Sequence, residues 1–171
     1  MTNISRTHDA ERTELSYRPI EAVYSGHQLR IIPSDPLYEP SPEIQDACLR
    51  LLIERFRKNG ITSTLYKEIR FIDPGQNFEA VVCDRCGQEI EMEAWQEMMG
   101  VAYETRFTDL SIVTPCCNKL SALNDLKYRG PAGFARYVLT VIDPPAEVDA
   151  EVLSELERVL GTKVKTIHLN V

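Results

Sequence analysis

Four cysteines, arranged as two close pairs, constrain the possible folds of this chain more than any other feature. Cys83 and Cys86 stand in the run Cys-Asp-Arg-Cys-Gly, and Cys116 and Cys117 stand in the run Pro-Cys-Cys-Asn, with 29 residues between the pairs. Two such pairs at this separation are typical of one tetrahedral Zn²⁺ site. Four thiolates fill the coordination shell of zinc, so no position remains for a substrate or an activated water. The sequence therefore predicts a structural zinc ion and argues against catalysis by that metal.

The second pair is irregular because its cysteines are adjacent. Successive side chains of a strand point to opposite faces, so both thiols can reach one metal only if the chain turns there. Pro115 before the pair and Asn118 after it favour such a turn, since Asn tolerates a positive φ. Two alternatives stay open. One is three cysteines with a different fourth ligand. The other is no metal, with a vicinal disulfide in the second pair or a redox role for the first.

The other cysteine and the histidines do not extend this ligand set. Cys48 lies on the apolar face of a predicted helix, which indicates a buried core thiol rather than a fifth ligand. The histidines His8, His27 and His168 are far from the cysteine pairs in sequence, and none has the spacing of a helical metal site. The predicted metal ligands are therefore Cys83, Cys86, Cys116 and Cys117.

Outside the cysteine region, the apolar pattern predicts the order strand, helix, strand, strand, helix, strand. The strands are expected at about 27–32, 63–72, 135–142 and 164–171, and the second helix ends at Gly161. The first helix begins after Ser41 as N-cap, with Pro42 at its first position, and is expected to stop at Asn59-Gly60. This order is the βαββαβ pattern of ferredoxin-like folds, in which the second and third strands form a hairpin.

The cysteine region falls where that hairpin would turn, and surface hairpins tolerate insertions because loop-closure entropy grows slowly with length. We therefore predict an α+β protein with a flexible N-terminal arm at 1–20 and a ferredoxin-like core at 21–77 and 131–171. Residues 78–130, called here the inserted segment, are predicted to be a zinc-ribbon-like module between the second and third core strands. A single mixed sheet whose outer strands continue into the inserted segment is the alternative.

Two stretches of the inserted segment and its exit contain candidate interaction residues. Residues 91–104 are expected to form a helix, and Trp95 caps the core of the module or, with nearby methionines, forms a partner-binding surface. Residues 121–136 are either a turn-rich connector or a polar recognition site. The candidates in that second stretch are Asn124, Asp125, Tyr128, Arg129 and Arg136.

The segment from Thr114 to Arg136 resembles a widespread set of uncharacterised bacterial proteins. Its runs Thr-Pro-Cys-Cys-Asn, Ala-Leu-Asn-Asp-Leu-Lys-Tyr and Pro-Ala-Gly-Phe-Ala-Arg are similar to theirs, and those proteins pair a Cys-x-x-Cys-Gly knuckle with a Pro-Cys-Cys-Gly knuckle. With the helix around Trp95, the resemblance covers about a third of the chain. Asn118 stands where that pattern has Gly. The resemblance implies that Cys116 and Cys117 form a ligand pair, and it implies no particular function.

The charge of the chain argues against nucleic acid as its partner. The chain has 19 basic and 26 acidic residues, for a net charge of −7, and residues 61–130 alone have 7 basic and 11 acidic residues. Zinc ribbons that bind nucleic acid use a basic surface, so the negative charge of residues 61–130 does not suit nucleic acid. The acidic surface is either a solvated face or a complement to a basic protein partner.

These features favour a non-catalytic zinc-binding protein that acts through protein–protein interaction. The N-terminus has no apolar signal core, and no apolar run approaches the roughly 18 residues of a membrane helix, so we expect a cytoplasmic protein with reduced thiols. Its small size and acidity suggest an immunity or antitoxin protein that neutralises a basic toxin. One alternative is a nucleic-acid or transcription-associated zinc-ribbon module. The other is an enzyme with a site at the junction, formed by Asp125, Tyr128, Arg129 and Arg136, although no nucleophile or phosphate-binding motif occurs.

Overall fold

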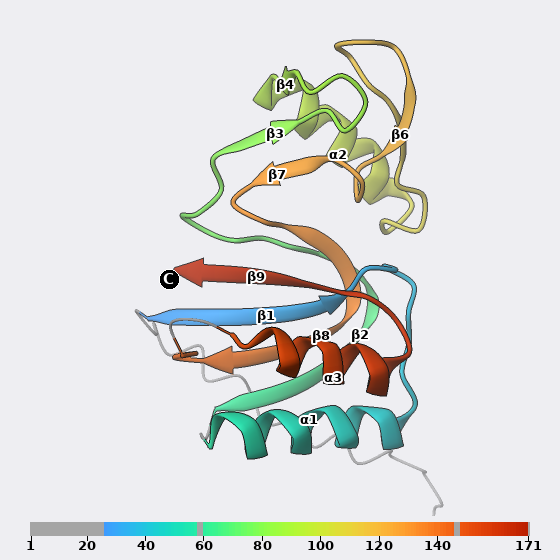
Figure 1. Ribbon diagram of the computed structural model, residues 1–171. Helices are drawn as coiled ribbons and strands as arrows, with labels where there is room; N and C mark the ends of the chain where they lie inside the picture. The colour runs from blue at the N-terminus through green and yellow to red at the C-terminus, as the bar shows by residue number, and fades with distance from the viewer. Residues whose placement is uncertain (1–25, 58–59, 146–147, 171) are drawn as a thin grey trace, which may run out of the picture.

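The computed structural model describes residues 26–57, 60–145 and 148–170, so the predicted arm at 1–20 lies outside the described residues. The described chain is a mixed α+β fold with three helices and antiparallel sheets (Figure 1). Its elements, in order, are β1 (His27–Pro33), α1 (Pro42–Phe56), β2 (Ile61–Ile72), β3 (Ala80–Val82), β4 (Glu89–Ile90), α2 (Met92–Glu104), β5 (Ser111–Val113), β6 (Leu120–Ala122), β7 (Lys127–Arg129), β8 (Gly133–Ile142), α3 (Ala150–Leu160) and β9 (Val164–Asn170).

The largest sheet has the strand order β2-β8-β1-β9, and every neighbouring pair is antiparallel. Helices α1 and α3 lie side by side on one face of this sheet (Figure 1). Alternate residues of the strands point toward the helices, because successive side chains of a strand face opposite ways. The resulting core contains Leu29, Ile31, Cys48, Leu52, Tyr137, Leu139, Val141, Val152, Leu156 and Leu160. Cys48 is fully buried there, and burial raises the pKa of its thiol to about 11.

The ends of α1 and α3 agree in part with the capping residues that the sequence predicts. The Ser41 hydroxyl accepts a hydrogen bond from the Ile44 N–H, as expected of an N-cap. Helix α1 ends at Phe56, before the predicted Asn59-Gly60 stop, because Arg57 adopts a left-handed conformation with a φ of 48°. Gly161 ends α3 as expected, with a φ of 70° and its N–H donated to the Glu157 carbonyl.

The inserted segment lies between β2 and β8 in the chain and forms two further antiparallel sheets around α2 (Figure 1). One sheet has the order β4-β3-β7, and the other pairs β5 with β6. The short strands β4, β6 and β7 are absent from the sequence prediction, which had only turns and a connector there. They form because neighbouring backbones pair with them, and a two- or three-residue strand has too few side chains to show periodicity.

A second hydrophobic cluster joins the inserted segment to the ends of β2 and β8. It contains Ile69, Val81, Cys83, Ile90, Trp95, Ala102, Ile112, Leu123, Leu126 and Phe134. Phe71 of β2 is central to this contact, since its ring lies 5.7 Å from Trp95 and 5.1 Å from Phe134, centroid to centroid. The inserted segment therefore shares a hydrophobic core with the ends of β2 and β8 in the largest sheet.

Within the described part of the chain, no helix has both the length and the apolar character that a membrane crossing requires.

Candidate metal centre

The structure brings the four paired cysteines together at the ends of two β-hairpins. The first hairpin consists of β3 and β4 and carries Cys83 and Cys86 in its turn. The second hairpin consists of β5 and β6 and carries Cys116 and Cys117. The four sulfur atoms all lie within 4.8 Å of one another. A cluster of this kind fits a metal ion.

The sulfur separations suit a tetrahedral ion of ordinary size. The Cys83 and Cys117 sulfurs are 3.9 Å apart, and the Cys86 and Cys116 sulfurs are 3.3 Å apart. Four sulfurs at about 2.3 Å from a central Zn²⁺ would be about 3.8 Å from one another in a regular tetrahedron. All five cysteines are free thiols, so the adjacent pair is not a vicinal disulfide in this structure.

The chain turns at the adjacent pair in the way the sequence predicts. The Asn118 N–H donates to the Thr114 carbonyl at 2.8 Å, and Asn118 has a φ of 54°. Gly87 has the matching place in the first hairpin, with a φ of 76° and its N–H bonded to the Cys83 carbonyl. A positive φ reverses the backbone tightly enough for both thiols of the second pair to face the first pair.

Burial and hydrogen bonding shift the pKa values of the Cys83 and Cys116 thiols in opposite directions. Burial by itself raises the pKa of the Cys83 thiol, but hydrogen bonds from the N–H groups of Cys86 and Arg85 and from the Cys116 and Cys86 thiols outweigh it and hold that pKa at about 6. Burial and then the neighbouring Cys86 and Cys83 sulfurs raise the pKa of the Cys116 thiol to about 12. Of these two thiols, Cys83 therefore ionises the more readily. A divalent cation binds thiolates, so metal binding at this cluster releases protons.

The site lies at the edge of the inserted segment. Cys83 is buried, Cys116 and Cys117 are half-buried, and Cys86 is exposed, which leaves a path by which an ion can enter. Polar contacts join the two hairpins beside the sulfurs. The Ser121 hydroxyl donates to the Asp84 carboxylate at 2.6 Å, and Arg85 Nε donates to the Leu120 carbonyl at 3.1 Å.

Sequence reasoning missed Thr114, whose hydroxyl oxygen lies 3.1 Å from the Cys117 sulfur. The signal that could have found it is its spacing: Thr114 precedes Cys117 by three residues, as Cys83 precedes Cys86.

The predicted interaction residues Trp95, Tyr128 and Asn124 lie mostly inside the fold. Trp95 is 9% exposed, and its indole N–H donates to the Tyr128 hydroxyl at 3.4 Å. Tyr128 in turn donates to the Leu123 carbonyl at 2.8 Å, and burial raises its pKa to about 12. The Asn124 side chain donates to the Ser34 carbonyl at 3.0 Å and accepts from the Phe134 N–H. Asn124 thus connects the exit of the inserted segment to the largest sheet.

The charged candidates have separate partners. Arg129 forms an exposed ion pair with Glu89 at 3.2 Å. Arg136 forms one with Glu39 at 2.7 Å. Asp125 favours the charged form of the half-buried Lys165 ammonium, although burial lowers the pKa of that lysine overall. The Lys165 ammonium donates to the backbone carbonyl of Asn124 at 3.0 Å.

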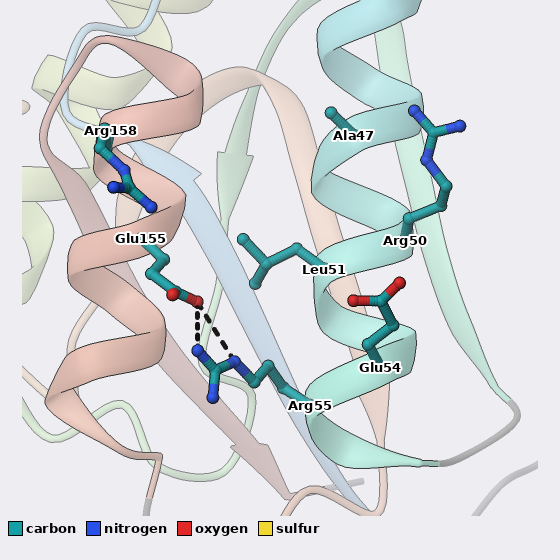
Figure 2. Close-up of a pocket in the computed structure, with 7 residues that line it drawn as sticks. All are labelled: Ala47, Arg50, Leu51, Glu54, Arg55, Glu155 and Arg158. Atoms are coloured by element: carbon teal, nitrogen blue, oxygen red, sulfur yellow. Dashed lines mark hydrogen bonds and ion pairs between the residues drawn. The ribbon is translucent and has the colours of Figure 1, made fainter.

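A surface hollow of about 370 Å³ lies between α1 and α3 (Figure 2), and no cysteine lines it. Leu51 and Ala47 line it beside charged side chains. Arg55 spans it to Glu155, with Nη2 and Nε at 2.7 and 3.2 Å from one carboxylate oxygen. Arg50, Glu54 and Arg158 complete its charged lining.

Comparison with protein-family models, with curated proteins and with solved structures finds no match to this chain. The geometry of the cysteine cluster and the charge of its surroundings are therefore the basis for a functional conclusion.

Proposed function

We propose that the four cysteines bind one structural Zn²⁺ ion and that the protein acts by binding another protein rather than by catalysis. The observation that carries this proposal is the cluster of four sulfurs within 4.8 Å of one another. Tetrahedral sites of four thiolates select zinc or iron among the common metals. A zinc ion with four protein ligands is closed to substrate, so its contribution is to the folding free energy.

The proposed architecture is a ferredoxin-like core with a zinc-ribbon-like module inserted between its second and third strands. The strand order β2-β8-β1-β9, together with α1 and α3 on one face, supports the core, since this is the antiparallel order of two interleaved βαβ units. The two cysteine hairpins support the module. In this architecture the metal holds the turns of the two hairpins together, beside the hydrophobic cluster to which Cys83 belongs.

The surface of the inserted segment suggests the charge of the partner. Residues 78–130 contain nine acidic and five basic residues. Three of the five basic side chains, Arg85, Arg106 and Arg129, already form ion pairs with carboxylates. The exposed carboxylates of α2, at Glu93, Glu97 and Glu104, have no ion-pair partner within the described part of the chain. Four thiolates on one Zn²⁺ add about two negative charges.

A surface of this sign attracts a basic protein and repels nucleic acid. The partner we propose is therefore a basic protein, and an immunity or antitoxin role in the cytoplasm, in which this chain covers a basic toxin, fits that charge.

Metal analysis tests the zinc site. Purified protein is expected to contain one zinc per chain, and a Cys83→Ser/Cys86→Ser double variant is expected to lose it. Cys48→Ala is the matched control, because Cys48 is buried in the other hydrophobic cluster and should leave the zinc content unchanged. Full retention of zinc in the double variant would mean that the ligands are assigned wrongly.

Affinity capture from the native host, followed by mass spectrometry, tests the partner. We expect a specific basic protein whose binding weakens with added salt and in a Glu93→Gln/Glu97→Gln/Glu104→Gln variant. An Asp46→Asn/Glu54→Gln/Glu151→Gln variant changes the charge equally on exposed positions of α1 and α3 and should bind normally. Capture of nucleic acid alone, or equal weakening by both variants, would contradict the proposal.

A further inference from the structure

The two cysteine hairpins have the same backbone design, displaced by 31 residues in the chain. In the first hairpin the Cys83 N–H donates to the Gln88 carbonyl at 2.8 Å, and in the second the Thr114 N–H donates to the Lys119 carbonyl at 2.9 Å. Strand pairing agrees, since the pair Val82 and Glu89 corresponds to the pair Val113 and Leu120. The left-handed residue falls at the same place in both turns.

The ligands do not follow this correspondence. Cys117 has the place that Cys86 has in the first hairpin, but the place of Cys83 is taken by Thr114. Cys116 instead has the place of Arg85, in the middle of the turn. The second hairpin therefore has the backbone of a regular knuckle with two residues between its ligands. Its first ligand, however, stands two positions later in the chain, at Cys116 instead of position 114.

Thr114 has an environment that surface threonines lack. It is fully buried, and among the residues that the structure describes it is the only polar or charged one that is buried. Its hydroxyl oxygen lies 3.1 Å from the Lys119 nitrogen, 3.2 Å from the Lys119 carbonyl oxygen and 3.1 Å from the Cys117 sulfur. The hydroxyl accepts from the Lys119 N–H and has one proton to donate, either to the carbonyl or to the sulfur.

We propose that Thr114 is a positioning residue of the metal centre, whose hydroxyl donates its proton to the Cys117 thiolate and sets the place of that sulfur. This inference rests on the proposed binding of a metal. With a metal bound, Cys117 is a thiolate, and an anionic acceptor competes for the proton better than a neutral carbonyl. In the first hairpin a different sulfur, that of Cys83, faces a backbone donor, the Arg85 N–H at 3.4 Å. Each hairpin thus offsets the charge of one thiolate.

A competitive titration of the full-length protein with Zn²⁺ against a chromophoric chelator tests the role of the hydroxyl. Thr114→Val has nearly the same shape without the proton, and we expect its zinc affinity to fall about 10- to 100-fold. Thr114→Ser keeps the hydroxyl and should restore most of the affinity. With Co²⁺ as a probe, the thiolate-to-metal charge-transfer band of Thr114→Val should move to lower energy, because an unbonded thiolate is more electron-rich. Native affinity and a native band in Thr114→Val would overturn the inference.

A ligand exchange tests the correspondence of the hairpins and remains decisive if Thr114→Val does not fold. Cys116→Ser should reduce the Co²⁺ charge-transfer intensity to that of a three-thiolate site. Adding Thr114→Cys should restore the four-thiolate intensity at one metal per chain, because the regular knuckle is re-created. Intensity no higher than in Cys116→Ser alone would overturn the correspondence. Failure of the native chain to bind Zn²⁺ or Co²⁺ would instead overturn the proposed metal site, so the two failures are distinguishable.

Discussion

Replacing Trp95 by alanine discriminates between the two roles that the sequence allows for this residue, core packing and partner contact. The indole is 9% exposed and lies between the inserted segment and the largest sheet. Its ring centroid is 5.1 Å from that of Phe78, 5.7 Å from that of Phe71 and 6.3 Å from that of Tyr128. Truncation therefore opens a cavity that aromatic rings line on several sides.

The expected cost follows from this packing. Truncation of a buried Trp or Phe to Ala costs about 3–5 kcal/mol, and each lost aromatic pair adds about 0.5–1.5 kcal/mol to simple burial, without strict additivity. We expect a loss of about 4 kcal/mol in the free energy of unfolding. Against a total of about 5–15 kcal/mol for a domain, the variant should fold but unfold at much lower urea.

Urea unfolding of Trp95→Ala, followed by far-UV circular dichroism in the presence of excess Zn²⁺, measures this loss. Circular dichroism is needed because Trp95 is the only tryptophan of the chain. Val101→Ala is the control on the same helix, since Val101 is 67% exposed and its truncation should change stability by less than about 0.5 kcal/mol. A loss below about 1 kcal/mol for Trp95→Ala would refute the core assignment and return Trp95 to the partner-binding surface.

Three further predictions concern backbone fit, pH and metal removal. Gly130→Ala should destabilise the protein by more than about 3 kcal/mol in thermal or urea unfolding, because a Cβ there would lie 1.7 Å from the Asn77 carbonyl oxygen and Gly130 has a φ of 76°. Gly100→Ala, in the middle of α2 with nothing within 4 Å of the new Cβ, should instead stabilise it by about 0.5–1 kcal/mol. Stability should fall between about pH 9 and 11, because the unfolded Cys48 thiol ionises first while burial holds its folded pKa at about 11; Cys48→Ala should flatten this slope in pH-dependent urea unfolding. A strong zinc chelator should shift the fluorescence of Trp95 to longer wavelength as its cluster loosens, and an unchanged spectrum after proven metal loss would separate the metal from the fold of the inserted segment.

Much of the element order could be predicted from local sequence pattern. Ser41 and Pro42 mark the start of α1, and Gly161 marks the end of α3, because capping depends on a few neighbouring residues. The end of α1 could not be predicted, since Arg57 takes the left-handed conformation that the sequence assigns more readily to Gly60. The strands β4, β6 and β7 also escaped prediction because they depend on partners elsewhere in the chain.

The candidate site, too, could be predicted only in part from the sequence. The identity and spacing of the paired cysteines already indicate a four-thiol cluster, and the structure places their sulfurs within 4.8 Å. The spacing of Thr114 from Cys117 matches that of Cys83 from Cys86, but spacing alone gives Thr114 no role, because its importance arises from being buried against Cys117 and from the correspondence between the two hairpins. A hydroxyl becomes a candidate for metal positioning only when its neighbours in space are known.

The sequence by itself therefore determined the chemistry of the cysteines, the acidic charge and the order of the helices and of the strands of the largest sheet, since these depend on residue identity and on periodicity over a few turns. The tertiary structure decided how the parts meet. It paired β7 with β3, packed Trp95 against Phe71 of β2 and set the two cysteine hairpins face to face. These outcomes depend on register and on contacts between residues far apart in the chain, where the free energy comes from burial shared by several elements rather than from any one segment.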